Sequence, residues 1–375
     1  MTPATSIGLV HTQYFTFAEE EPFRLESGAT LRPVTLAYET YGTLAADRSN
    51  AILICHALSG SAHAAGRYAP DDDKPGWWDD CIGLGKAFDT NRYFVICSDS
   101  LCCVRAFDGQ VVTTGPASIN PDTGKPYGLD FPVTSVADMV HVQKALVDHL
   151  GITQLAAVAG PSAGSVMAVQ WAVEYPEMVR RVIAVICPGL VFTAYQRSVM
   201  ESWCAPILLD PAWKEGAYDL KQQPVAGITE SFRQVFLWAI SPSWLERAIG
   251  DGWADPERDP AVSIRHQFKS YAGVGALAAM GTPFCDANHI LYMARAAGIY
   301  DAKSKIANAK AKFLFIPAES DLLSLPSRSQ EAVEDIRAAG GRAELFMLKG
   351  NGGHFDGLNL IGQARDVIQD FLAKD

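Results

Sequence analysis

The pentapeptide Gly160-Pro161-Ser162-Ala163-Gly164 has the composition of a turn that presents a serine for chemistry. It lies between a short apolar run at 155–159 and a run with helical periodicity at 165–175. A Gly-x-Ser-x-Gly turn between a strand and a helix strains the serine backbone and exposes the hydroxyl at the edge of a parallel sheet. The glycines leave room for the neighbouring strand and helix. We therefore predict that Ser162 is a nucleophile.

A nucleophilic serine needs a base to take its proton and an acid to orient that base. After this kind of turn, the acid and then the histidine follow in sequence, each behind a later strand. The apolar run 312–317 predicts a buried strand, and Asp321 comes shortly after it. The run 343–348 predicts a further strand, and His354 ends the glycine-rich loop behind it. We expect both side chains at the same edge of the sheet as Ser162, with His354 as the general base.

Both assignments have competitors in the sequence. Glu319 could take the place of Asp321, which could instead cap a turn or a helix. A short acid near the loop tip fits the pattern better and favours Asp321. His354 alone among the eight histidines follows both the serine and the acid. The others fall in an N-terminal arm, in a loop after an early strand, on a predicted surface helix and in the long middle segment: His11, His56, His63, His141, His149, His266 and His289.

Acyl chemistry at a serine also requires two backbone N–H groups that stabilise the oxyanion. Ala163 follows the nucleophile at the positive end of its predicted helix, so its N–H is the first candidate. The second should come from the loop at 56–61, behind the strand predicted at 51–55, and Leu58 is the candidate there. We expect His56 to brace this loop by hydrogen bonds rather than to take part in the chemistry.

Strand-like runs recur along the chain and alternate in several places with runs of helical periodicity. Such alternation predicts an α/β architecture, a mostly parallel sheet with helices on both faces. The strand-like runs are 34–41, 51–55, 93–97, 155–159, 182–187, 312–316 and 343–348. The clearest helical runs are 136–150, 165–175, 327–339 and 361–372.

The alternation stops in the middle of the chain. Residues 188–303 are rich in Trp, Ala and Met and contain short helical patterns, among them 228–240 and 286–297. We interpret 188–303 as a helical lid inserted into a core whose first part is 1–187 and whose second part is 304–375. Most of the lid's aromatic and Met residues should pack its own interior rather than contact a ligand.

Composition excludes several classes of function. The 375 residues exceed a typical single domain, and a hydrophobic fraction of 49% supports a large packed core with an insertion. The net charge of −11 argues against nucleic acid and anionic membrane surfaces as partners. Residues 1–17 lack the basic start and apolar stretch of a secretory signal. The eight cysteines lack paired metal-ligand spacings, so we expect reduced thiols in a cytoplasmic protein and no metal site.

Seven segments of the chain match the pattern of a known family: 55–63, 114–121, 124–128, 131–132, 160–164, 210–213 and 286–288. In these segments the sequence resembles the homoserine O-acetyltransferase branch of the α/β-hydrolase fold. The resemblance covers nearly the whole chain and implies a Ser162/Asp321/His354 triad, an acetyl-enzyme formed on Ser162, a cytoplasmic location and a homodimer.

The chain departs from this family where the acceptor amino acid would bind. Transferases of the family usually place an arginine before their Asp-Pro-x-Trp segment to hold the homoserine carboxylate; a gapless match puts Cys204 there. They usually follow the catalytic histidine with an aspartate for the amino group; here Phe355 takes that position. Cysteine cannot supply the bidentate charged fork of arginine. Arg197 and Asp356 could replace the missing groups only through local insertions. Further departures are Pro161 and Ala163 in the turn and the long loop 101–112.

We therefore predict a serine esterase that hydrolyses short-chain esters, acetyl esters first among them, without a cofactor. An acyl-enzyme that binds no alcohol acceptor is resolved by water. Cys204, Trp238 and Phe355 are the candidate substrate contacts. The alternative is a homoserine O-acetyltransferase of methionine biosynthesis, with acetyl-CoA as cosubstrate. A non-catalytic relative of the fold is disfavoured, because the nucleophile, acid, base and both oxyanion loops are present.

Overall fold

The computed structural model describes residues 6–374 and has the predicted α/β-hydrolase architecture. An eight-stranded sheet runs in the order β1-β4-β8-β5-β11-β12-β13-β14. β4 is antiparallel to both β1 and β8, and every other neighbouring pair is parallel. The bounds of the strands are β1 Gln13–Phe17, β4 Val34–Tyr41, β5 Ala51–Cys55, β8 Phe94–Ser98, β11 Ala157–Pro161, β12 Arg181–Val185, β13 Lys312–Ile316 and β14 Arg342–Leu345.

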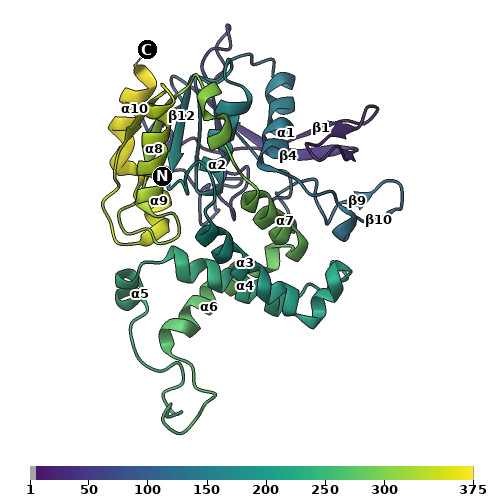
Figure 1. Cartoon of the computed structure of the whole chain (residues 1–375), viewed down its shortest axis with the longest axis vertical. Coiled ribbons are helices and arrows are strands. Elements are labelled where there is room, and N and C mark those ends of the chain that lie inside the picture. Colours follow the sequence, from purple (N-terminus) through teal and green to yellow (C-terminus); the bar gives the residue numbers. More distant parts are fainter. Residues whose placement is uncertain (1–5, 375) are drawn as a thin grey trace.

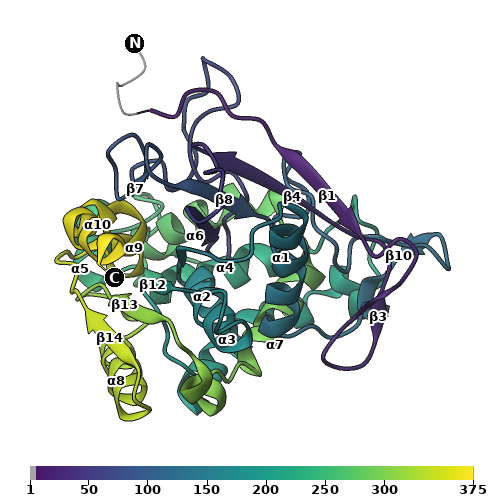
Figure 2. The same ribbon diagram turned by 90° about the horizontal axis from the view of Figure 1, so that it is seen from above.

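The central strands are apolar on both faces because both faces are covered. β5, β11 and β12 are buried along their whole length. One face packs on α1 Val136–His149, α2 Ala163–Glu174 and α8 Pro326–Ala338, and the other packs on α10 Arg365–Ala373 together with the chain between β5 and β8. Figure 2 shows these helices on the two sides of the sheet. The parallel strands therefore end together at one edge, where the loops behind β5, β11, β13 and β14 meet.

Five longer helices lie between β12 and β13 in the sequence, and α3, α4, α5 and α6 lie beyond one edge of the sheet (Figure 1). The two ends of this segment meet, since Val191 bridges to Asp301 and the Ala302 N–H donates to the Leu190 carbonyl at 2.9 Å. Their bounds are α3 Ala194–Leu209, α4 Val225–Ala239, α5 Pro242–Ala248, α6 Lys269–Gly281 and α7 Ala287–Gly298.

Buried His289 on α7 connects this helical segment to the core. Its Nδ1 lies 2.8 Å from the Cys103 carbonyl, and its Nε2 accepts from the Ala117 N–H at 3.1 Å. Asp286 caps α7 and accepts the Tyr218 hydroxyl at 2.7 Å. Trp213 donates to Asn288 at 2.8 Å. The family-like segments at 210–213 and 286–288 thus make structural contacts.

The remaining elements are short. Three two-stranded ribbons flank the sheet, and a one-turn helix follows the loop of His354. Among residues 6–374, no helix is both long and apolar enough to span a membrane. The bounds are β2 Phe23–Arg24, β3 Thr30–Leu31, β6 Ile82–Gly83, β7 Phe88–Asp89, β9 Ile119–Asn120, β10 Lys125–Pro126 and α9 Asp356–Asn359.

Element ends account for most differences from the sequence-based expectation. The strand expected at 343–348 ends at Leu345, although Leu348 still donates to the Pro317 carbonyl at 2.9 Å. The strand expected at 155–159 is displaced by two residues: β11 spans Ala157–Pro161 and ends directly before Ser162. The helical run 361–372 begins as a 3₁₀ turn, Ile361–Ala364, before α10.

Candidate active site

Ser162 occupies a strained turn between β11 and α2. Its φ and ψ are 56° and −120°, a region that non-glycine residues rarely adopt, and its N–H donates to the Val185 carbonyl at 2.9 Å. A Cβ on Gly160 would lie 2.4 Å from the Cys55 carbonyl oxygen, and one on Gly164 would lie 2.0 Å from the same atom. Both glycines are therefore required by the close approach of β5.

The structure brings the three predicted triad side chains into one hydrogen-bonded chain. His354 Nε2 lies 2.8 Å from Ser162 Oγ, and His354 Nδ1 lies 2.7 Å from Asp321 Oδ2. The other oxygen of Asp321 accepts the N–H groups of Leu323 and Ser324 at 2.8 and 2.9 Å. Asp321 is 1% exposed, so its charge acts on the imidazole with little screening by water. This geometry suits proton transfer from the serine to His354 Nε2.

Glu319, the competing acid, points away from this chain. It pairs with Lys349 at 2.7 Å and accepts the Gly350 N–H at 3.2 Å. Lys349 and the Gly350 N–H hold the pKa of Glu319 below its ordinary value. Of the two acids weighed from the sequence, only Asp321 contacts the histidine.

The loop that carries His354 depends on Asp356. The Asp356 carboxylate accepts the Gly352 N–H at 2.9 Å and the Ser320 hydroxyl at 3.3 Å, and burial raises its pKa. Ser320 in turn accepts the Gly353 N–H at 3.0 Å. Asp356 therefore braces the loop instead of entering the cavity beside Ser162. In the sequence, the only indication of this bracing role is that Asp356 lies two residues after His354, behind a glycine-rich loop.

The two predicted oxyanion donors, Leu58 and Ala163, both line the cavity beside Ser162. Ala163 opens α2, where the first N–H groups have no acceptor within the helix. His56 fixes the other loop: its Nδ1 lies 2.7 Å from the Ala57 carbonyl, and its Nε2 accepts the Ser100 N–H at 3.0 Å. Burial lowers the pKa of His56 to about 4, so the ring is neutral and braces the loop as expected.

A cavity of about 150 Å³ opens beside Ser162 and His354. Helices α3, α4 and α7 contribute much of its wall, and α1, α2 and the segments at 57–59, 186–192, 322–324 and 354–358 contribute the rest. Within the described residues, no Asp, Glu, Lys or Arg side chain lines it. The larger apolar side chains of the wall are Met139, Met167, Phe192, Met200, Trp203, Phe232, Phe236, Trp238, Met293 and Phe355.

Of the three candidate substrate contacts, two line the cavity and one does not. Trp238 and Phe355 line the cavity, and the Phe355 ring packs against Phe236 with centroids 5.7 Å apart. Cys204 is buried on α3 but is not part of the lining, whereas Trp203 is. The arginine considered as a displaced clamp, Arg197, is exposed and donates to the Gly298 carbonyl at 2.9 Å.

Sequence reasoning missed Ile186, which lines the cavity directly behind β12. Its φ of 45° is unusual for a β-branched residue, and its N–H donates to the Ile316 carbonyl at 2.9 Å. A Cβ on Gly357 would lie 2.7 Å from the Ile186 side chain. Nothing in the local sequence indicated this strain, because isoleucine favours an extended strand.

His56, Asp99 and Cys103 form one buried group whose potential ligand atoms lie within 4.8 Å of one another. Their hydrogen bonds point to bracing. His56 Nε2 accepts from Ser100, and the two oxygens of Asp99 accept the N–H groups of Ala62 and Val112 at 2.7 and 2.9 Å. A metal ion would have to displace these bonds.

The fold and the hydrogen-bonded serine, histidine and aspartate define the class. Residues 50–356 match the family model of the alpha/beta hydrolase fold, and the chain belongs to that family. Within it, the chain belongs with the homoserine O-acetyltransferases and their relatives. It is 44% identical to a homoserine O-acetyltransferase of Methanosphaerula palustris, over 98% of this chain and 74% of that protein. A homoserine O-acetyltransferase of Deferribacter desulfuricans is 40% identical over 98% of this chain and 97% of that protein.

Solved structures of both enzyme types are equally similar in shape. Esterase E22 superposes with a TM-score of 0.92 at 40% identity, over 97% of this chain and 100% of that chain. Homoserine O-acetyltransferase from Bacillus anthracis superposes with a TM-score of 0.92 at 36% identity, over 98% of each chain. Overall similarity therefore leaves the choice between these activities to the side chains of the site.

Proposed function

We propose that this protein is a serine esterase that hydrolyses short-chain esters, acetyl esters first among them, through an acyl-Ser162 intermediate. One observation carries the proposal: the Ser162–His354–Asp321 chain opens into a cavity that, within the described residues, is lined by no Asp, Glu, Lys or Arg side chain. A neutral ester of small size fits such a cavity without leaving a charge unpaired.

Catalysis would proceed in two transfers. Ser162 Oγ attacks the ester carbonyl while His354 Nε2 takes the hydroxyl proton, and Asp321 stabilises the imidazolium. The Leu58 and Ala163 N–H groups would stabilise the oxyanion. As the C–O bond to the alcohol breaks, His354 returns the proton to the departing oxygen. Water then attacks the acyl-enzyme with His354 again as base, which releases the acid and frees Ser162.

Charge recognition argues against homoserine as the acceptor. Homoserine carries an ammonium and a carboxylate, and each charge-assisted hydrogen bond contributes about 1.5–3 kcal/mol. Without a charged partner for either group, acceptor affinity falls by roughly a hundredfold or more. Phe355 stands where the family places an aspartate, Arg197 and Asp356 bond elsewhere, and Cys204 supplies no cation. Water would then outcompete homoserine.

The second candidate, homoserine O-acetyltransferase, is supported by the names of the relatives that match the whole chain. Acetyl-CoA would then be a cosubstrate; the esterase needs no cofactor. A homodimer in the cytoplasm is proposed on the same resemblance, and the small-molecule ester is the expected partner rather than nucleic acid or a membrane.

The deciding experiment gives the purified protein p-nitrophenyl acetate, butyrate and longer esters beside acetyl-CoA with homoserine. We expect rapid hydrolysis of the acetyl and butyryl esters, with no acceleration and no O-acetylhomoserine when homoserine is added. Formation of O-acetylhomoserine faster than ester hydrolysis would overturn the esterase.

A further inference from the structure

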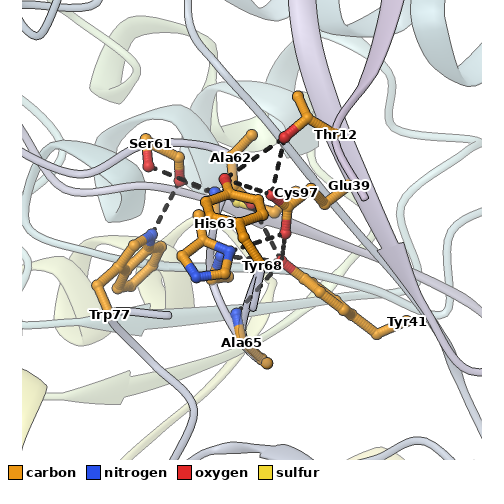
Figure 3. A network of polar contacts seen from close by, with 12 residues as sticks. Thr12, Glu39, Tyr41, Ser61, Ala62, His63, Ala65, Tyr68, Trp77 and Cys97 are labelled. Carbon is orange, nitrogen blue, oxygen red and sulfur yellow. Dashed lines mark hydrogen bonds and ion pairs between the residues drawn. The ribbon is translucent and has the colours of Figure 1, made fainter. Parts of the chain in front are cut away.

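A buried polar network joins β4 to residues 61–65, the segment that follows the Leu58 loop in the sequence (Figure 3). Its centre is Glu39 on β4, which is 0% exposed and does not line the cavity beside Ser162. A second carboxylate, Asp99, is also 0% exposed and lies just past the end of β8. Burying carboxylates is costly unless hydrogen bonds compensate, so their arrangement needs a reason.

Glu39 is surrounded by donors on both oxygens. Oε2 accepts the Tyr41 hydroxyl at 2.8 Å and faces His63 Nδ1 at 3.1 Å. Oε1 accepts the Tyr68 hydroxyl at 2.7 Å and the Thr12 hydroxyl at 3.4 Å. Four donors match the acceptor capacity of an ionised carboxylate. Burial raises the pKa of both tyrosines, which keeps their hydroxyl groups protonated as donors.

Tyr41 transmits this anchor to the backbone behind the Leu58 loop. Its hydroxyl oxygen accepts the N–H groups of Ala64 and Ala65 at 2.9 and 3.2 Å and lies 3.1 Å from the Ala62 carbonyl. A hydroxyl offers one proton and two lone pairs, so the bond to Glu39 and the two bonds from Ala64 and Ala65 already saturate it. The path of residues 62–65 is therefore set by one phenol group that Glu39 orients.

The remaining backbone groups of this segment are held in the same way. Ala62 donates to Asp99 at 2.7 Å, and the Ser61 carbonyl accepts Trp77 Nε1 at 2.8 Å. The His63 ring stacks on Tyr68 with centroids 4.1 Å apart, which closes the network on its outer side. Only two residues separate Leu58 from Ser61, so a displaced 61–65 segment would also displace the Leu58 N–H.

We propose that Glu39 is a positioning residue: acting through Tyr41, it fixes the Leu58 N–H at the distance from Ser162 that the oxyanion requires. The role rests on the proposed function, because it needs an oxyanion to form. Glu39 itself touches neither substrate nor the reacting atoms. It acts on the rate of acylation, while the apolar cavity that binds the ester is left as it is.

The test compares Glu39→Gln and Tyr41→Phe with a matched control, Asp89→Asn. Gln keeps the shape of Glu39 but replaces one acceptor with a donor, and Phe removes only the linking hydroxyl. Asp89 is likewise a hydrogen-bonded carboxylate on a strand, but its donors include the backbone N–H groups of Gly85 and Asn91, and it forms no hydrogen bond with residues 56–65. A fluorophosphonate titrates the active sites of each variant. The turnover rate is then expressed per reactive site, so misfolded protein does not lower the measured value.

Removing an oxyanion donor costs roughly 10²–10³ in kcat, and a displaced donor should cost about tenfold or more. We expect that loss per titrated site in Glu39→Gln and Tyr41→Phe, with KM within about threefold. Affinity for a trifluoromethyl ketone, which binds Ser162 as an oxyanion, should fall by the same factor as kcat/KM. Asp89→Asn should keep its turnover per site.

A turnover per titrated site within about twofold of wild type in both variants would overturn the inference, even if their melting temperatures fall. If Glu39→Gln does not fold, Tyr41→Phe decides alone. An inactive, unlabelled wild type would overturn the proposed function together with this role, whereas active variants of an active wild type would overturn this role only.

Discussion

The two sides of the cavity are built from different materials. On the sheet side, Ser162, His354 and Asp321 are held by short hydrogen bonds from loops at strand ends. On the side of α3, α4 and α7, the wall is aliphatic, aromatic and thioether surface apart from Gln196. Directional bonds fix atoms within tenths of an ångström, whereas apolar contacts select by shape and by the absence of charge. The contrast implies that reaction type is set by the sheet and substrate choice by the helices.

The largest effect should come from the sheet side. Ser162→Ala removes the nucleophile, so we expect turnover of p-nitrophenyl acetate to fall by ~10³-fold or more with the melting temperature nearly unchanged. Mass spectrometry of wild-type protein treated with a fluorophosphonate should place the adduct on Ser162. An adduct on another residue, or retention of more than about one percent of the rate, would remove the basis of the contrast.

The next effect separates the two acids. Asp321→Asn should lower kcat by roughly 10³–10⁴, because the amide favours the wrong tautomer of His354. Glu319→Gln loses only an exposed contact to Lys349 and should keep most of the activity. The measurement is kcat for one acetyl ester in both variants. A larger loss in Glu319→Gln would mean that the acid has been assigned to the wrong residue.

On the helical side, we expect a smaller and differently distributed effect. Trp238→Ala removes ring surface from the cavity wall, and loss of about 1.5–3 kcal/mol of apolar burial should raise KM for apolar esters by ~10–100-fold with kcat less affected. Trp253→Ala is the control, since Trp253 is 43% exposed and outside the lining. Equal effects of the two substitutions would show that the helical wall does not select substrates.

The smallest effect concerns stability against pH. Burial raises the pKa of Asp99 to about 7, whereas an unfolded aspartate titrates near its ordinary value of about 3.9. The folded state therefore binds this proton more tightly, and that stabilisation is present below about pH 4 and lost as pH rises through 7. Relative to Asp99→Asn, wild type should lose at most about 4 kcal/mol of unfolding free energy over this range. Denaturant titrations of both proteins at several pH values measure their unfolding free energies. If the two free energies change with pH in parallel, the prediction is contradicted.

Much of the sheet side could be predicted from the sequence, because its residues follow strands in a fixed order. Ser162, Asp321 and His354 each follow an apolar run within a few residues, and parallel strands place such positions at one edge. Asp356 and Ile186 could not be assigned, since their roles depend on contacts made by loops distant in sequence. No local pattern encodes such contacts.

The helical side was harder to predict for a related reason. Cavity-lining residues of α3 recur at helical spacing, at 195, 196, 199, 200 and 203, and Cys204 falls just outside that face. A gapless match fixes position along the chain but not the rotation of a helix about its axis. Trp238 and Phe355 reach the cavity, while Cys204 packs beside it.

The two ends of the helical segment lie side by side, so sequence changes within the segment need not disturb the sheet. Because Val191 bridges to Asp301 and Leu190 accepts from Ala302, the segment leaves and re-enters the sheet at a single point. Insertions, deletions or whole replacements between these residues need not pull β12 and β13 apart. Sequence changes within this segment could therefore reshape the cavity wall, while the strand-end loops that carry Ser162, Asp321 and His354 keep their positions.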